Sequence, residues 1–305
     1  MQSKLISESE IQEMLQFTSV SHAAAWLKRT PEYAKAWADL DENSLHRGQI
    51  EKLLKASIFK DFSKIYQFAN PEQRKFLDLY SRRYEIRVLK EIMTNLFDHK
   101  STDAVDVSPY CDFFRRHSKL DLDRLTACTT MDEFINTLKG NEFYVPLSRI
   151  QNHDTALLFD YGMALDLYYF SMIWNVRKKL FSGKDLEQIT TAYGEKFDML
   201  NLQFISRSKR YFSMAPADIY ALLIPMNYKL KKEEITALVE ASTREEAQQI
   251  FRKTYYGKKY DHLSAHNLEE FYNYMLRTTL EKASRKDPYS CLLYTSDAAD
   301  EEDSV

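Results

Sequence analysis

A pattern that repeats about every 110 residues constrains the fold of this chain more than any other feature of its sequence. Three segments align: SEIQEMLQFTSVSHAAAWLKRTPEY from Ser9, LDLDRLTACTTMDEFINTLKGNEFY from Leu120, and EEITALVEASTREEAQQIFRKTYY from Glu233. Apolar residues coincide at three aligned positions: Met14 with Leu125 and Leu238, Ala23 with Phe134 and Ala247, and Leu27 with Leu138 and Phe251. Apolar residues four apart lie on one face of a helix, so each segment predicts a helix that packs on one side.

A hydroxyl residue also stands at the same place in each aligned segment, as Ser19, Thr130 and Thr243. Ser and Thr often precede a helix, because the side-chain oxygen accepts a hydrogen bond from a free backbone N–H of the first turn. In the third copy, Glu246 follows Thr243 by three residues, which is the spacing of a capping box. Each segment therefore predicts a short helix followed by a second helix with a Ser or Thr cap.

A second pair of segments shares nearly the same offset: YSRRYEIRVLKEI from Tyr80 and YGEKFDMLNLQFI from Tyr193. Both carry an acid inside an otherwise apolar helix, Glu85 in the first and Asp198 in the second. Such an acid either reaches the surface or pairs with a nearby Arg, or it lines a central cavity shared by the repeats. Basic stretches beside them, SRRYEIR and SRSKR, fit solvated faces or a dock for an acidic partner helix.

The composition agrees with an all-α fold. The chain has only six glycines and seven prolines among 305 residues, and 44% of its residues are apolar. The most apolar stretch, residues 156–174, is interrupted by Asp160 and Asp166. It therefore predicts a buried helix, not a membrane span. The repeat divides the chain into helical repeat 1 at 1–112, helical repeat 2 at 113–213, and an incomplete helical repeat 3 at 214–290.

The last residues, 291–305, differ in character from the rest. They hold five acidic residues and no basic residue, and they show no helical periodicity. A third copy of the segments that begin at Tyr80 and Tyr193 would be expected near this position. The stretch CLLYTSDAADE also resembles the translation of a transposon adapter used in sequencing libraries. We expect a disordered, translated adapter fused after Ser290; an ordinary disordered acidic tail is the alternative.

Charge and cysteine content exclude several classes of function. Without the tail, 42 basic residues face 40 acidic ones, so no basic excess predicts binding to nucleic acid or to an acidic membrane surface. Cys111, Cys128 and Cys291 lack metal or redox spacing, which indicates reduced thiols in a cytosolic protein. The N-terminus has no apolar signal core.

Motifs of catalysis and of nucleotide binding are absent from the sequence. His262 and His266 stand four apart, but no acid accompanies them as in a zincin, so a solvated pair is the preferred interpretation. Asp121 and Asp123 are expected to place negative charge at a helix N-terminus. We expect no catalytic residue, no metal and no cofactor, and we place a helical enzyme last among the candidate classes.

Several blocks, in order, resemble the C subunit of bacterial V-type (A/V-type) ATPases, whose eukaryotic counterpart is the d subunit. They are LHRGQIEKLL, FANPEQRKFLDLYSRRYEIRVLK, FFRRHSKLDLDRL, ALDLYYFSMIWNVRKKL, YGEKFDMLNLQFISRSKRYF, ADIYALLIPMNYKLKKEEI and SRKDPYS. The resemblance covers essentially residues 3–290. The resemblance implies three helical lobes around a pseudo-threefold axis, which form a funnel. We expect the third lobe of this chain to be truncated, because members of the family continue after PYS with another helical segment. We therefore expect the chain to be less stable than a full-length relative.

The resemblance also implies a non-catalytic subunit of the rotor, at the cytoplasmic face of the membrane. Its partners would be the central-shaft subunits and the membrane proteolipid ring, and it would transmit torque for proton or sodium transport without binding nucleotide itself. Repeat position suggests that Glu85, Asp198 and Arg207 contact the shaft. The alternative is a generic helical-repeat scaffold that binds an unrelated partner.

Overall fold

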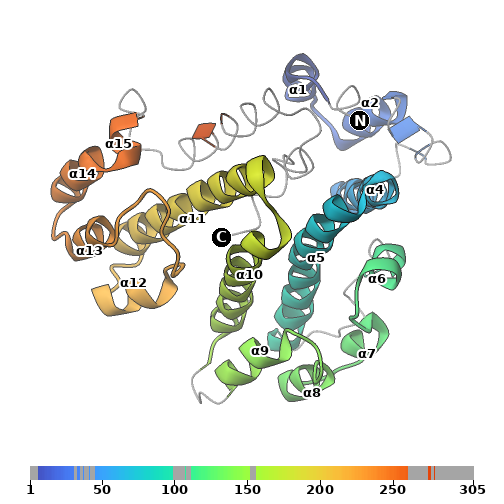
Figure 1. Cartoon of the computed structure of the whole chain (residues 1–305). Coiled ribbons are helices and arrows are strands. Elements are labelled where there is room, and N and C mark those ends of the chain that lie inside the picture. Colours follow the sequence, from blue (N-terminus) through green and yellow to red (C-terminus); the bar gives the residue numbers. More distant parts are fainter. Residues whose placement is uncertain are drawn as a thin grey trace.

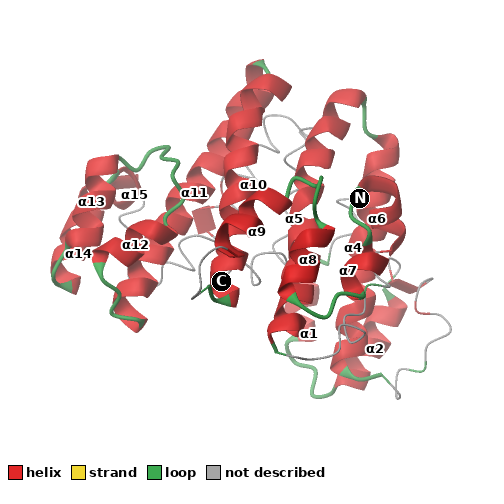
Figure 2. Ribbon diagram, turned by 90° about the horizontal axis from the view of Figure 1, so that it is seen from below, coloured by secondary structure: helices red, strands yellow, loops and turns green. Residues whose placement is uncertain are grey.

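The computed structural model describes residues 6–30, 33–34, 37, 41, 45–98, 107, 111–151, 156–259, 274–275 and 278. Within these ranges every regular element is a helix, and Figure 2 shows helices and loops without a strand. The all-α prediction is therefore confirmed. The helices are α1 (Glu8–Met14), α2 (Val20–Arg29), α4 (Arg47–Phe68), α5 (Pro71–Phe97), α6 (Cys111–His117), α7 (Leu122–Thr126), α8 (Met131–Thr137), α9 (Tyr144–Gln151), α10 (Leu158–Leu180), α11 (Gly183–Tyr211), α12 (Pro216–Leu222), α13 (Lys232–Glu240), α14 (Arg244–Lys253) and α15 (Tyr255–Lys259).

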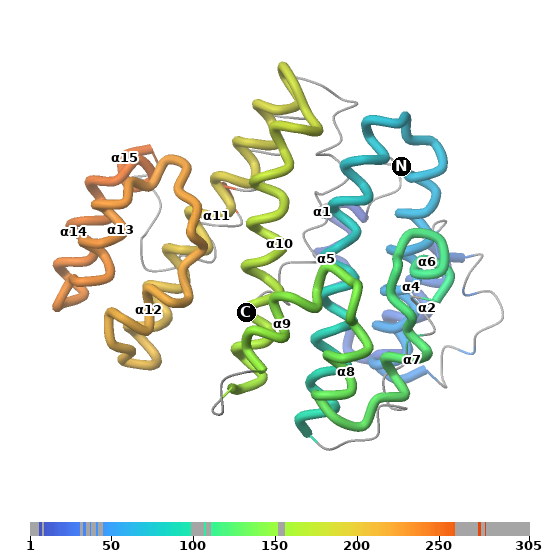
Figure 3. The backbone as a smooth tube through the Cα atoms, turned by 60° about the horizontal axis from the view of Figure 1, so that its bottom comes forward, coloured from blue at the N-terminus to red at the C-terminus, as the bar shows by residue number. Residues whose placement is uncertain are grey.

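Four long helices organise the part of the molecule that the structure describes. Figure 3 shows α4, α5, α10 and α11 next to one another in that order. α10 packs against α5, α9 and α11. From α10, α11 runs toward α12–α15 at the far side of the molecule (Figure 1), and it contacts α12 and α13 there. Short helices thus lie at both sides of a central group of long ones.

The three predicted Ser/Thr caps are confirmed. The hydroxyl oxygen of Ser19 accepts from the N–H of His22 at 3.1 Å, and Thr130 and Thr243 accept from Glu133 and Glu246 at 3.2 Å each. The predicted capping box at Thr243 is shifted by one residue. The Glu246 carboxylate accepts from the N–H of Ser242 at 2.7 Å, and not from that of Thr243.

Glu133 repeats this shifted arrangement in the second copy, where its carboxylate accepts from the N–H of Thr129 at 2.9 Å. Because Glu133 and Glu246 occupy aligned positions, the two copies share a detail of hydrogen bonding that their general pattern did not predict. The predicted role of Asp121 is also confirmed: it caps α7 by accepting from the N–H of Arg124 at 3.1 Å.

The aligned positions of α5 and α11 are buried in both helices. The pairs are Tyr80 and Tyr193, Tyr84 and Phe197, Glu85 and Asp198, Ile86 and Met199, Leu89 and Leu202, and Ile92 and Ile205, none of which is more than 7% exposed. Sequence similarity between the two segments thus corresponds to similar burial. The boundaries of the repeats remain predictions, and residues 291–305 lie outside the described part of the chain.

Residues 156–174 form most of α10, as predicted, and the two acids within them have separate roles. Asp160 accepts from the N–H of Leu157 at 2.8 Å, at the start of the helix. Asp166 accepts from the ammonium of Lys90 on α5 at 2.6 Å. The ion pair lies between two helices in contact, which explains how an acid is accommodated in this apolar segment.

Among the described residues, the buried apolar side chains form two large clusters and a smaller one, and α11 contributes to both large clusters. Ile189, Tyr193 and Phe197 belong to the cluster around α5 and α10, whereas Leu202 and Ile205 belong to the cluster around α12–α15. The third cluster joins α2 to the start of α4.

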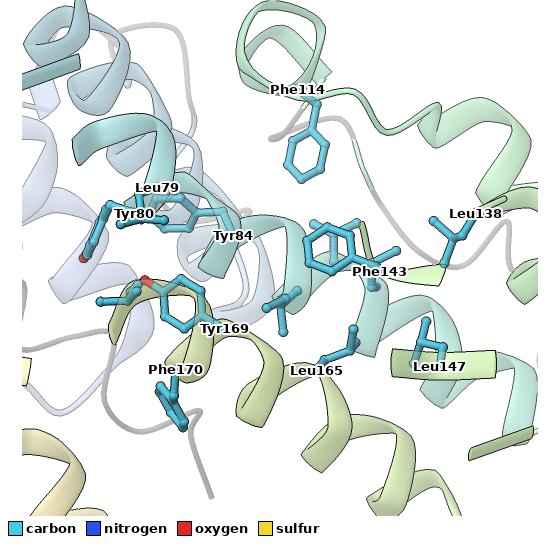
Figure 4. Packing of buried hydrophobic residues seen from close by; sticks show 14 of the residues in the cluster. Leu79, Tyr80, Tyr84, Phe114, Leu138, Phe143, Leu147, Leu165, Tyr169 and Phe170 are labelled. Atoms are coloured by element: carbon cyan, nitrogen blue, oxygen red, sulfur yellow. The ribbon is translucent and has the colours of Figure 1, made fainter. Parts of the chain in front are cut away.

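Figure 4 shows part of the largest cluster. Tyr80 and Tyr84 from α5, Tyr169 from α10, and Phe143 from the loop before α9 gather in the space between the helices. Tyr169 and Phe170 are both buried, which agrees with the buried helix predicted for residues 156–174. Because one continuous helix lies in both large cores, the two halves of the described molecule share a structural element.

Candidate functional site

Asp198 lies in the middle of α11 and is completely buried. Its carboxylate accepts from the backbone N–H groups of Tyr228, Lys229 and Leu230 at 3.0, 2.6 and 2.9 Å, and from the Tyr256 hydroxyl at 2.8 Å. Burial raises the pKa of Asp198, although these four donors oppose the rise. One side chain thus fastens the loop that precedes α13 to the middle of α11.

Glu85 occupies the aligned position in α5 and is also buried. Its carboxyl group faces the Arg82 guanidinium at 3.5 Å and is hydrogen-bonded by the Ser118 hydroxyl. Burial raises the pKa of Glu85 to about 7, while Arg82 and Ser118 oppose the rise and Glu142 adds to it. Of the two predicted alternatives for these acids, pairing with a nearby Arg is the one observed for Glu85.

The two buried acids have similar places in the chain. Glu85 contacts Ser118, which lies in the segment before α7, and Asp198 contacts Tyr228, Lys229 and Leu230, which lie in the segment before α13. Since α7 and α13 begin aligned repeat segments, each acid connects a long helix to the segment that starts the next copy.

An ion pair accompanies each acid, with its charges exchanged. Arg82 of α5 contacts Glu142 at 2.6 Å, whereas Glu195, which aligns with Arg82, contacts Lys259 at 3.5 Å. Glu142 and Lys259 both follow the second short helix of their copy. Sequence reasoning missed these pairs, although Arg82 and Glu195 stand at the same position of the two quoted segments. A charge reversal between aligned residues was the available signal.

Arg207, the third predicted contact residue, is exposed near the end of α11. Arg210, Tyr211 and Phe212 are also exposed there, and the Arg210 guanidinium lies 5.1 Å from the centre of the Tyr211 ring. The structure therefore does not bring the three residues together at one surface. Glu85 and Asp198 present almost no area to a partner, whereas Arg207 is accessible.

Other candidates for chemistry give no site in the described residues. No group of three or more His, Cys, Asp or Glu side chains there could hold a metal ion. Cys111 and Cys128 are free thiols. His262, His266 and Cys291 lie outside the described residues. Within the described part, none of the helices has the length and apolar character needed to cross a membrane.

Comparison with known proteins gives two matches. The sequence model of the ATP synthase (C/AC39) subunit family matches residues 1–295. The C subunit of the A-type ATP synthase of Methanothermobacter thermautotrophicus is 21% identical over 243 residues, which cover 78% of this chain. The chain spans 59% of the length of that relative. The family match confirms the resemblance drawn from the sequence. It also agrees with the expectation that the chain is an accessory subunit of a complex and not itself an enzyme. The chain belongs to the ATP synthase (C/AC39) subunit family.

Proposed function

We propose that this chain is a non-catalytic member of the central stalk of a V-type or A-type ion-translocating ATPase, which links the rotor shaft to the membrane proteolipid ring. The observation that carries the proposal is the family match over residues 1–295. The chain would lie at the cytoplasmic face of the membrane and would transmit torque that drives, or is driven by, the movement of protons or sodium ions. Three lobes, at 1–112, 113–213 and 214–290, would form the funnel that receives the shaft.

The packing of the described helices supports a mechanical role. A protein that transmits torque must resist deformation, and close-packed interiors have low compressibility and transmit strain. α11 contributes buried residues to both large apolar clusters, so a load on one cluster reaches the other through a continuous helix. At the centre of that helix, Asp198 adds four hydrogen bonds to the start of the next repeat segment.

The accessible part of the proposed shaft contact is Arg207, together with the exposed Tyr211 and Phe212 at the end of α11. Glu85 and Asp198 would act in this contact by holding the surrounding helices in place, because both side chains are buried. A surface that combines an arginine with aromatic rings suits a protein interface, where these residue types are enriched.

Binding to the shaft protein tests the proposal directly. The purified chain is titrated with the purified shaft protein of the same ATPase, and the dissociation constant is measured by interferometry. We expect saturable binding, and we expect Arg207→Glu to weaken it about tenfold, which is about 1.4 kcal/mol. The control is Lys184→Glu, an exposed charge reversal at the other end of α11, which should bind as the unaltered chain does.

Failure of the chain to bind the shaft protein contradicts the proposed function and favours a scaffold for another partner. Binding that is unaffected by Arg207→Glu leaves the rotor role intact and removes Arg207 from the contact.

A further inference from the structure

A groove of about 890 Å³ opens on the second repeat, between α5, α7, α8 and residues 138–145. Of its apolar lining residues, Leu120 and Tyr144 are partly exposed and Val145 is half exposed, whereas Leu125 and Leu138 are almost completely buried. The same groove is lined by four basic side chains and two acidic ones: Arg82, Lys119, Arg124, Lys139, Asp121 and Glu142. Apolar and charged groups are therefore available within one cavity.

Both acids of the groove are already engaged by donors of this chain. The Glu142 carboxylate contacts the Arg82 guanidinium at 2.6 Å and accepts from the Tyr168 hydroxyl at 2.8 Å. The Asp121 carboxylate accepts from the N–H of Arg124 at 3.1 Å, as the cap of α7. The negative charge of the groove is therefore partly neutralised by groups that also hold the fold together.

The remaining three cations are exposed and available. Lys119, Arg124 and Lys139 lie at the surface, and none of their side chains forms an ion pair or a hydrogen bond with another described residue. Three such cations beside an apolar lining favour a ligand that carries several carboxylates and also apolar side chains.

The third repeat differs at the position that borders this groove. Gly257 aligns with Tyr144, and a Cβ atom on Gly257 would lie 2.2 Å from the carbonyl oxygen of Phe251. The chain therefore approaches the end of α14 closely after Thr254. In the second repeat, the side chain of Tyr144 lines the groove. Because Tyr144 has a Cβ atom, the backbone there cannot come as close to the preceding helix as it does at Gly257.

We propose that this groove binds an acidic amphipathic helix of a partner protein, with apolar side chains against Leu120, Tyr144 and Val145 and carboxylates against Lys119, Arg124 and Lys139. A helix in an apolar groove is a recurrent mode of recognition, read through anchors on one helix face. The apolar lining favours this ligand over a small anion such as phosphate, which gains nothing from apolar contact. The groove is lined by residues of α5, α7, α8 and 138–145, whereas Arg207 lies near the end of α11.

The probe is a fluorescein-labelled synthetic helix of about 18 residues, with Leu on one face and Glu on the other, which is long enough to be helical. Its binding to the full chain is followed by fluorescence anisotropy. The combined variant Lys119→Glu, Arg124→Glu and Lys139→Glu should weaken binding at least about tenfold and reduce its salt dependence. The control combines Lys178→Glu, Lys179→Glu and Lys184→Glu, which are exposed on α10 and α11 and make the same change in net charge.

A second variant, Val145→Glu, guards against misfolding of the first, since it adds one repelling charge at a half-exposed position. Thermal melts by circular dichroism show whether each variant is folded. We expect weaker binding with both variants, unchanged binding with the control, and no binding of a peptide that carries Lys in place of Glu. Equal binding by Val145→Glu and the unaltered chain overturns the proposal. Displacement of the peptide by millimolar phosphate or ATP at constant ionic strength also overturns it, and assigns the groove to a small anion.

Discussion

At the scale of single residues, the buried acids of α5 and α11 occupy aligned positions, but different groups satisfy their carboxylates. Asp198 is satisfied by three backbone N–H groups and the Tyr256 hydroxyl. Glu85 has the Arg82 guanidinium and the Ser118 hydroxyl. A buried carboxylate is stable only when it is paired or hydrogen-bonded, so the two acids differ in how much of their burial cost is offset. Their mutational effects should differ accordingly.

Replacement of Asp198 should strongly destabilise the protein. Asp198→Ala leaves several buried donors without an acceptor, and we expect the free energy of unfolding to fall by about 4 kcal/mol. Tyr256→Phe removes one hydrogen bond to the same carboxylate and should cost about 1.5 kcal/mol. Urea unfolding followed by circular dichroism measures both values. The control is Glu187→Ala, an exposed acid on the same helix, and a similar loss for all three variants would contradict this role of Asp198.

Glu85 should make stability depend on pH. The pKa of Glu85 is 4.5 in the unfolded chain and about 7 in the folded protein. A carboxyl group whose pKa is higher in the folded protein contributes fully to stability below the unfolded pKa. This contribution is lost as the pH rises from 4.5 to about 7. The expected loss over this window is about 3 kcal/mol. Glu85→Gln stays neutral, so this variant should lack that slope and be the more stable protein at pH 8. Unfolding at several pH values measures it, and an unchanged slope in Glu85→Gln would exclude Glu85 as its origin.

At the scale of the elements, the close contacts of a helix require small residues at particular positions. Gly194 of α11 aligns with Ser81 of α5, and both are buried small residues. A Cβ atom on Gly194 would lie 2.4 Å from the Tyr228 ring, which stands in the segment held by Asp198. Gly194 therefore allows that segment to reach the helix. Gly162 of α10 has no such contact, because a Cβ atom there would lie 3.6 Å from Cε of Lys90, which is an ordinary van der Waals distance.

This difference predicts opposite effects of one substitution at two helical glycines. Gly194→Ala should lower the free energy of unfolding by about 2 kcal/mol, because the added methyl group overpacks the contact with Tyr228. Gly162→Ala should raise it by up to about 1 kcal/mol, because alanine favours the helix and the site has room. Thermal melts of the two variants, compared at equal concentration, provide the measurement. Stabilisation by Gly194→Ala would show that the ring moves away without cost.

At the scale of the whole molecule, α5 and α11 connect segments that lie far apart in the sequence. A long helix holds the start of the next copy through a buried acid and an ion pair, and the pair has opposite polarity at the two connections. α11 then joins two apolar clusters along its length. Figure 1 shows that this helix is the link between α10 and α12–α15. These features predict that the described helices unfold together, as one cooperative unit.

Hydrogen exchange tests this unity. Amides in the buried parts of α5 and α11, near Leu89 and Leu202, should exchange at the slow rates set by global unfolding. Those of α13 near Leu238 should be nearly as slow, because the cluster around α12–α15 includes residues of α11. Mass spectrometry after timed exchange gives the rates. Exchange in α13 that is faster than in α11 by orders of magnitude would show that the two clusters open separately.

The sequence by itself determined the features that depend on local pattern. The helices, the caps at Ser19, Thr130 and Thr243, and the apolar faces of α5 and α11 all follow from side chains within a few residues of each other. The buried acids Glu85 and Asp198 could be singled out in the same way, since an acid in an apolar helix is conspicuous. Arg207 could be identified as basic, but its exposure depends on which side of α11 the rest of the chain covers.

Only the tertiary structure decided what these residues contact. Asp198 accepts from Tyr228, Lys229 and Leu230, about 30 residues away, through backbone N–H groups that every residue except proline carries. Because these donors are backbone groups, the identities of the residues at 228–230 do not indicate that they bind Asp198. The pairing of Glu142 with Arg82, which leaves Lys119, Arg124 and Lys139 free around the groove, likewise depends on how α5 packs beside α8. Local propensity fixes the helices, but long-range packing decides which charges are neutralised and which remain available to a partner.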